Sequence, residues 1–210
     1  MKSSPGRLRI VLLAAALATS SLAATAAARA ETAAAVDAIW KAQRINFQFH
    51  GDGTQYTCSG LRKKIERILL SVGARKGVAL HVSFCDDLAG AARFQITLES
   101  PVEATLHNVQ QMTAHDSHDV LIARTRGETL VSAEDLPRLR AAWKTVSFAR
   151  DRGMRLAPAD CELVRQLRRQ VLPHMSLRIV SDNVRCSQFG NISAPRLTVS
   201  ALVPVGIERT

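Results

Sequence analysis

Residues 58–72 read CSGLRKKIERILLSV, and this stretch decides the fold that we expect. Its apolar residues recur at intervals of three and four, which places them on one face of a helix; they are Leu61, Ile65, Ile68, Leu69 and Val72. Gly73 then ends the pattern, and residues 93–100 alternate between apolar and polar, as a half-buried strand does. The sequence therefore predicts a helix that begins at Cys58 and packs on a sheet.

The same pattern returns further along the chain. A shift of 103 residues aligns Cys58 with Cys161 and Trp40-Lys41 with Trp143-Lys144. Over residues 36–103 the shift gives eleven identities, where average composition gives roughly five. The other pairs are Ala38/Ala141, Arg62/Arg165, Leu69/Leu172, Arg75/Arg178, Ala91/Ala194, Arg93/Arg196, Pro101/Pro204 and Val102/Val205, and Cys85 matches Cys186 at a shift of 101. We therefore expect an internal duplication.

Each copy predicts a β-α-β-β unit preceded by a short helix. The expected ranges are helix 36–43, strand 45–49, helix 58–72 and strands 78–85 and 93–100, then helix 132–144, strand 146–149, helix 158–172 and strands 177–186 and 196–203. Between the copies, 120–124 and 129–131 predict a hairpin. Trp40 and Trp143 close the two short helices, and we expect both to be buried.

These elements predict an α+β fold. We expect two tandem pseudo-repeats whose helices pack on one face of a mixed or antiparallel sheet. The expected boundaries are a signal peptide at 1–30, a first repeat unit at 31–105, a connector with a hairpin at 106–131 and a second repeat unit at 132–210.

The start of the chain predicts export. Lys2, Arg7 and Arg9 precede the apolar run 10–17, and a small-residue tract ends at Ala28-Arg29-Ala30, the pattern of a cleavable secretory signal peptide. The apolar run is too short to cross a bilayer, which takes roughly 20 residues, and we expect no transmembrane segment in the mature chain. Cleavage removes four of the 28 Lys and Arg residues and none of the 18 acids, which leaves 24 minus 18, or +6. We expect a periplasmic or secreted protein.

Four cysteines in an exported chain predict disulfides. Three pairings are possible, and all three respect the repeat. Locality favours Cys58–Cys85 and Cys161–Cys186, each of which ties the start of a main helix to the following strand. Loops of this size stabilise a fold by about 3 kcal/mol each in the chain-entropy model. The alternative is a reactive thiol at a helix N-terminus, but neither helix cysteine belongs to a Cys-x-x-Cys pair.

Three runs of the first copy carry a resemblance. Trp40-Lys41-x-Gln43, Tyr56-Thr57-Cys58-Ser59-Gly60-Leu61-Arg62-x-Lys64 and Leu70-x-x-Gly73-Ala74-Arg75 resemble uncharacterised secreted proteins of Gram-negative bacteria. The resemblance covers most of the mature chain. The resemblance implies location and fold only.

Chemical motifs are weak throughout. His115 and His118, with the two aspartates beside them, are the best candidates for metal ligands, but the same residues suit a solvated loop, and we expect no metal and no cofactor. Gly51-Asp52-Gly53-Thr54 lacks the third glycine of a dinucleotide loop and the Gly-Lys-Ser/Thr of a phosphate loop. No serine lies in a nucleophile elbow. We therefore assign no catalytic residue.

Both main helices are basic, and this is the strongest indication of function. The candidate surface for an anionic partner consists of Arg62, Lys63, Lys64, Arg67, Arg165, Arg168 and Arg169, although such a run is also the ordinary solvated face of an amphipathic helix. Few aromatic residues and the expected compartment argue against nucleic acid. The sequence favours a non-enzymatic binding or accessory protein that contacts an anionic envelope component or an acidic protein. The alternative is a cell-envelope hydrolase with a site between the two repeats.

Overall fold

The fold is built around one long strand, β1 (Val36–His50). The computed structural model describes residues 34–51, 55–86, 90–187 and 193–206, all within the unit Ala33–Thr210. The expected signal peptide, 1–30, lies outside the described residues. Among the described residues, no helix has the length and apolar character needed to cross a membrane.

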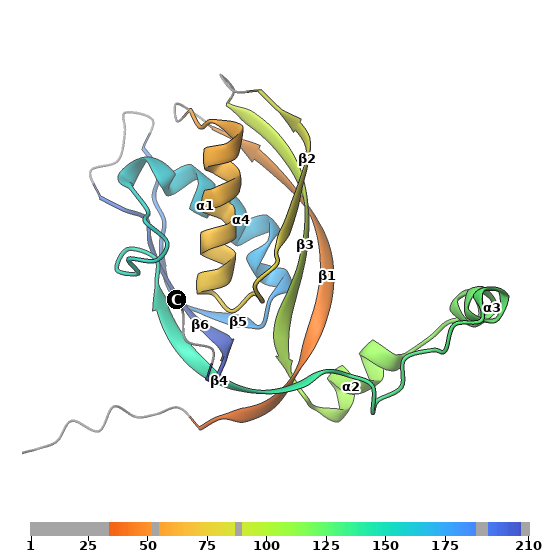
Figure 1. The fold of residues 1–210 in the computed structure, drawn as a ribbon. Coiled ribbons are helices and arrows are strands. Elements are labelled where there is room, and N and C mark those ends of the chain that lie inside the picture. Colours follow the sequence, from red (N-terminus) through yellow and green to blue (C-terminus); the bar gives the residue numbers. More distant parts are fainter. Residues whose placement is uncertain (1–33, 52–54, 87–89, 188–192, 207–210) are drawn as a thin grey trace, which may run out of the picture. The chain divides into compact units, whose positions relative to one another are not determined.

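Six strands form one antiparallel sheet in the order β2-β3-β1-β4-β6-β5 (Figure 1). After β1, the chain forms α1 (Cys58–Ser71), β2 (Ala79–Cys85), β3 (Ala91–Glu103), α2 (Leu106–Thr113), α3 (Ser117–Arg126) and β4 (Arg138–Ser147). It continues with the 3-10 turn η1 (Pro158–Asp160), α4 (Cys161–Gln170), the 3-10 turn η2 (Leu172–His174), β5 (Leu177–Asn183) and β6 (Arg196–Pro204). The α+β class and the antiparallel sheet agree with the prediction.

The helix α1 begins and ends where its sequence dictates. The Thr57 side chain caps the first turn by accepting a hydrogen bond from the Gly60 amide. At the other end Gly73 has a φ of 103°, in the left-handed region. A Cβ on Gly73 would lie 2.4 Å from the Leu202 carbonyl oxygen, so only glycine allows the helix to end this close to β6.

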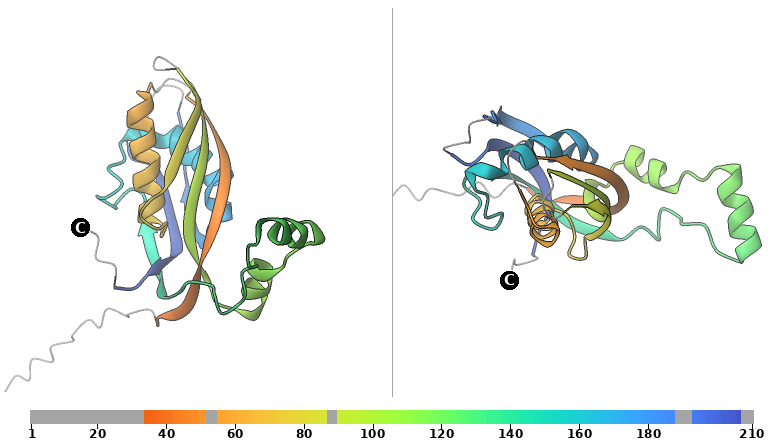
Figure 2. Two further views of the ribbon diagram at one scale, coloured as in Figure 1. Left: turned by 45° about the vertical axis from the view of Figure 1, so that its right-hand side comes forward. Right: turned by 90° about the horizontal axis from the view of Figure 1, so that it is seen from above.

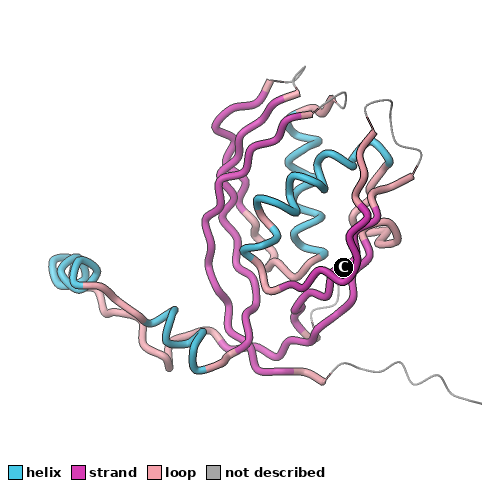
Figure 3. The backbone as a smooth tube through the Cα atoms, turned by 180° about the vertical axis from the view of Figure 1, so that it is seen from behind, coloured by secondary structure: helices cyan, strands magenta, loops and turns pink. Residues whose placement is uncertain are grey.

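The sheet opens between its two halves. β1 pairs with β3 from Ala38 to His50, but with β4 only from Val36 to Ile39. Beyond these four pairs the strands separate, and α1 and α4 lie between the two groups of strands (Figures 1 and 3). The apolar faces of both helices join inward-facing strand residues such as Phe47 and Phe94 in one buried cluster. Full burial of each such side chain contributes about 1.5–3 kcal/mol.

The two predicted short helices are strands in the structure. Residues 36–43 belong to β1 and 138–144 belong to β4. The Ala, Lys and Gln residues of 36–43 favour a helix locally, but the intrinsic preference is a few tenths of a kcal/mol per residue and pairing with β3 overrides it. In 132–144, Ser132 and Asp135 close a turn through their side chains. Pro137 follows, and a proline argues against a helix interior.

The predicted hairpin in the connector is also wrong. Residues 120–124 lie in α3, and residues 129–131 lie in neither a helix nor a strand. Asp116 and Asp119 form a capping box at the start of α3, and Gly127 ends it with a φ of 64°. Figure 2 shows α2 and α3 beyond the ends of β1 and β3, away from α1 and α4.

Candidate functional site

The structure divides the seven predicted basic residues into two groups. Three of them are neutralised by carboxylates of the same chain and do not present a free charge. The pairs are Lys64–Asp160 at 2.6 Å, Arg165–Glu162 at 2.6 Å and Arg168–Asp182. Most of the basic character of α4 therefore serves the fold, which the sequence alone did not reveal.

The remaining four cations are Arg62, Lys63 and Arg67 on α1 and Arg169 on α4. None of them makes an ion pair with any residue in the described ranges. We call Arg62, Lys63 and Arg67 the α1 basic face. Their positions lie between the buried positions of the helix, and their side chains are exposed or half-buried. Glu66 lies on the same side of the helix, so the net charge of this side is three minus one, or +2.

A second polar cluster joins the two halves of the chain. Asp160, only 1% exposed, accepts hydrogen bonds from the Tyr56 hydroxyl at 2.6 Å and from the Lys64 ammonium at 2.6 and 2.7 Å. The Ala157 amide donates a further bond to the second carboxylate oxygen at 2.6 Å. Both oxygens of the buried carboxylate are thus occupied, which is how a buried charge is tolerated. We call this cluster of Tyr56, Lys64, Ala157 and Asp160 the clasp, because it connects the start of α1 to the residues just before α4.

The Tyr56 hydroxyl provides a direct test of this clasp. Burial and the hydrogen bond to Asp160 raise the pKa of Tyr56 well above the usual value near 10. Because the unfolded chain loses the phenol proton near pH 10 and the folded chain keeps it, stability is retained below about pH 10 and falls as the pH rises further. Tyr56 is the only tyrosine, so tyrosinate absorbance reports on it alone. We expect this absorbance to appear together with the loss of circular dichroism in one alkaline transition. Titration near pH 10 in protein that is still folded would contradict the clasp.

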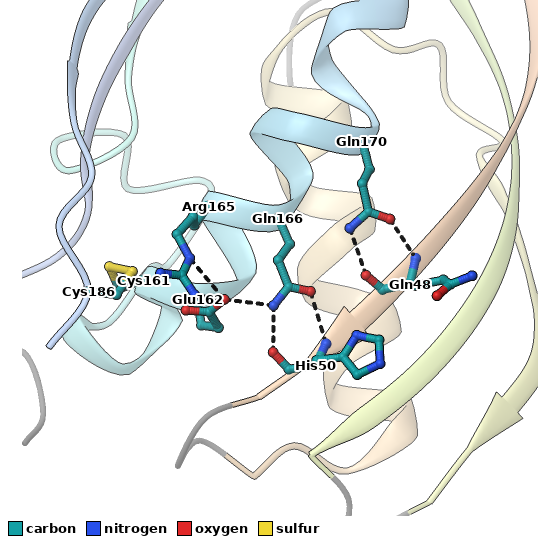
Figure 4. A network of polar contacts seen from close by, with 8 residues as sticks. All are labelled: Gln48, His50, Cys161, Glu162, Arg165, Gln166, Gln170 and Cys186. Atoms are coloured by element: carbon teal, nitrogen blue, oxygen red, sulfur yellow. Dashed lines mark hydrogen bonds and ion pairs between the residues drawn. A yellow bond between two sulfur atoms is a disulfide. The ribbon is translucent and has the colours of Figure 1, made fainter. Parts of the chain in front are cut away.

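Polar side chains of α4 cover the edge of β1 that β4 leaves open (Figure 4). The Gln166 amide accepts from the His50 N–H at 2.9 Å and donates to the His50 carbonyl at 2.5 Å. The Gln170 amide makes the same pair of bonds with Gln48, at 2.9 and 2.8 Å. Gln166 is itself oriented by the Glu162 carboxylate at 2.7 Å.

The repeat distances of the two elements explain this arrangement. Gln166 and Gln170 are one turn apart, about 6 Å along a helix, and Gln48 and His50 are two residues apart, about 6.8 Å along a strand. Each glutamine therefore meets one residue of β1 whose backbone N–H and C=O both point toward α4. Exposed sheet edges promote aggregation, and here two side-chain amides occupy the hydrogen-bonding groups that a neighbouring strand would otherwise take.

Trp40 and Trp143 were predicted to be substantially buried, and both are half-buried. The Arg75 guanidinium lies 5.4 Å from the centre of the Trp40 ring, and the Arg178 guanidinium lies 4.4 Å from that of Trp143. These are cation–π distances. The Trp143 indole also donates to the Glu103 carboxylate at 2.7 Å. Each indole is therefore in contact with an arginine, and Trp143 also packs against the small buried cluster of Ala38, Ala141 and Leu202.

Of the two predicted metal candidates, His118 belongs to a group of described residues that could share an ion, and His115 does not. The His115 ring lies 3.0 Å from the Val131 carbonyl oxygen. Asp116, His118 and Asp119 do lie close enough to share an ion, but all three are exposed. Asp116 and Asp119 already serve as the capping box of α3, and this explains the cluster without a metal.

The predicted disulfide pairing is confirmed. Cys58 and Cys85 are bonded with a Cα–Cα distance of 6.1 Å, and Cys161 and Cys186 with one of 5.6 Å, both normal for disulfides. Each bond anchors the first residue of α1 or α4 at or just beyond the end of an edge strand. Neither α1 nor α4 can leave the sheet at its N-terminus without breaking a covalent bond.

Two small hollows lie near the ends of the sheet hairpins. One, of about 240 Å³, is lined by Phe49, His50, Phe84, Ala91, Ala92 and Arg93. The other, of about 170 Å³, is lined by Cys161, Asn183, Arg185, Ser193, Ala194, Pro195 and Arg196. Both are smaller than the 300–1,000 Å³ that is usual for drug-sized ligands. Sequence reasoning missed both hollows, because their lining residues are brought together only by strand pairing.

Comparison with protein-family models, with curated proteins and with solved structures returned no match.

Proposed function

We propose that this protein is a non-enzymatic binding or accessory protein of the periplasm or the extracellular space, and that its partner carries negative charge. The α1 basic face is the observation that carries the proposal. Its three cations have no ion-pair partner in the described part of the chain, whereas three other cations of the two main helices are paired. Two disulfides support an oxidising compartment.

The α1 basic face is held on a rigid support. Cys58 fixes the first turn of α1 covalently, and the close approach of Gly73 to β6 fixes its end. The apolar side of the helix is buried in the main cluster. Because the charges are ordered before contact, a partner does not have to supply the free energy of arranging the scaffold. We propose an anionic envelope surface as the partner.

The proposal includes an origin by duplication, with two tandem pseudo-repeats. The halves share the element order β-α-β-β, and their strands take mirrored places in the sheet, 2-3-1 beside 4-6-5. The residues that match at a shift of 103 also make matched contacts, since Arg75 covers Trp40 and Arg178 covers Trp143. Both local disulfides support the same interpretation.

Charge removal from α1 tests the function. The triple variant R62Q/K63Q/R67Q is compared with R150Q/R152Q/K144Q, which removes one lysine and two arginines at exposed positions elsewhere. Near an anionic membrane each basic residue contributes about 1 kcal/mol. We therefore expect the α1 variant to bind phosphatidylglycerol vesicles on the order of 100-fold more weakly, with a change of a few-fold at most in the control. Sedimentation of the oxidised protein with vesicles measures this, and phosphatidylcholine vesicles give the uncharged background.

The dependence of vesicle binding on salt concentration is the second measurement. Wild-type binding should weaken steeply between low salt and physiological salt, where the screening length falls to about 8 Å. Equal losses in the two triple variants would show that overall charge, and not the α1 basic face, is responsible. Unchanged binding by the α1 variant would refute the proposal.

A further inference from the structure

The smaller hollow lies at the end of the hairpin formed by β5 and β6. Asn183 and Arg196 are directly opposite each other in the ladder, and Arg185 follows β5 two residues later. All three residues line the hollow together with Ser193. Cys161, which the disulfide to Cys186 holds at the start of α4, also lines the hollow. Two arginines and two small polar residues therefore line one space.

Both arginines of this hollow are without a neutralising partner among the described residues. Arg185 and Arg196 are exposed and make no ion pair or side-chain hydrogen bond with any residue the structure describes. The neighbouring carboxylate, Asp182, is engaged by Arg168. Cys161 lies between two carboxylates, Asp160, which Lys64 engages, and Glu162, which Arg165 and Gln166 engage. The hollow consequently has two positive charges whose nearest acidic neighbours in sequence are already paired.

The first half of the chain has a hollow at the corresponding place. The shift of 103 residues matches Ala91 with Ala194 and Arg93 with Arg196, and these residues line the two hollows. The shift of 101 that aligns the later cysteines matches Phe84 with Arg185. One arginine is therefore common to both hollows. The second arginine is particular to the β5–β6 hollow, where the first half has an exposed phenylalanine.

We propose that the β5–β6 hollow binds a tetrahedral oxyanion, a phosphate or sulfate group. Guanidinium groups recognise such oxygens through paired N–H donors, and charge-assisted bonds of this kind are the stronger ones. Arg185 and Arg196 supply the charge, and the Asn183 amide and the Ser193 hydroxyl supply neutral donors. A volume of about 170 Å³ suits a single such group with the first atoms attached to it. This site is separate from the α1 basic face and stands without it.

Isothermal titration calorimetry with three probes tests the site: inorganic phosphate, sulfate and glycerol 3-phosphate, each at constant ionic strength. We expect saturable binding with one site per chain. R185Q and R196Q should each weaken it by about tenfold or more, since a hydrogen bond to a charged group is worth about 1.5–3 kcal/mol. R93Q is the matched control, because it removes the corresponding arginine from the other hollow, and its affinity should stay within about twofold of the wild type.

The three probes distinguish the source of the oxyanion. Equal affinity for phosphate and sulfate supports a site for any tetrahedral oxyanion, and binding of glycerol 3-phosphate alone supports a site for organic phosphate esters. The variant R62Q/K63Q/R67Q should bind the probes normally, so failure of the α1 basic face and failure of this site are separable.

Nuclear magnetic resonance gives a second measurement that needs no substitution. The Nε–H signals of Arg185 and Arg196 should shift when phosphate is added to wild-type protein. Absence of saturable binding for all three probes, unmoved arginine signals, or an equal loss in R93Q would overturn the proposal.

Discussion

Replacing Cys58 and Cys85 together by alanine is expected to lower the free energy of unfolding by about 3 to 4 kcal/mol, and so is replacing Cys161 and Cys186. The crosslinks span 27 and 25 residues, and closing loops of this length removes that much chain entropy from the unfolded state. Domains of ordinary stability have about 5–15 kcal/mol in total. Loss of both crosslinks should therefore leave a large part of the protein unfolded at 37 °C.

Urea denaturation followed by circular dichroism measures the effect. Reduced wild-type protein is the control, because it loses both crosslinks without any substitution and should resemble the variant that lacks all four cysteines. Since the two bonds lie in different halves of the chain, their costs should add to within about 0.5 kcal/mol. A cost below about 1 kcal/mol for each pair would mean that the unfolded chain is already constrained in some other way.

Replacing Lys64 by methionine is expected to destabilise the fold by about 3 to 5 kcal/mol. Methionine conserves the length of the side chain but leaves the Asp160 carboxylate, 1% exposed, without its cation. An uncompensated buried charge has a cost in this range. The matched control is K63M at the next position, where the lysine is exposed and belongs to the α1 basic face. That change should stay within about 0.5 kcal/mol of the wild type.

A second substitution distinguishes the loss of charge pairing from the loss of packing. In K64M/D160N the carboxylate is replaced by a neutral amide, so part of the lost stability should return. If K64M costs no more than K63M, or if D160N does not restore any stability to K64M, the clasp does not contribute the free energy that its geometry indicates. Chemical denaturation of the four proteins in one buffer provides the comparison.

The helix α1 and the disulfide pairing were predictable because both depend on local sequence. Apolar residues at helical spacing, the Thr57 cap and Gly73 define α1 within the short stretch 57–73, and each disulfide joins residues fewer than thirty positions apart. The strand at residues 36–43 was not predictable in this way. Its helical preference is overridden by a ladder to β3, whose residues lie more than fifty positions away.

The connector is a different kind of error, since the signals for α3 are local. Asp116 precedes the helix, Asp119 completes the capping box and Gly127 ends it. The stretch 120–124 was interpreted as a strand because a short, mainly apolar run has no period that distinguishes a strand from a helix. The capping residues would have decided the question.

The candidate sites depend on tertiary structure to differing degrees. The basic residues of α1 are visible in the sequence, and their exposure follows from the helical period. Which cations remain free does not follow from the sequence, because Asp160 and Asp182 reach Lys64 and Arg168 across the fold. The β5–β6 hollow and the glutamine contacts to β1 likewise combine residues from separate elements.

The sequence by itself determined the main helices, the strands that follow them and the crosslinks, because helical and strand periods and short loop closure act over a few turns of chain. Only the tertiary structure decided that β1 runs unbroken from Val36 to His50, that the sheet opens beyond Ile39 with α1 and α4 between its halves, and which charges face solvent. Most of these features depend on contacts between residues far apart in the chain, such as Gln43 with Ser100, 57 positions away, and Gln48 with Gln170, 122 positions away. The free energy of such contacts exceeds the small local preferences that a sequence displays.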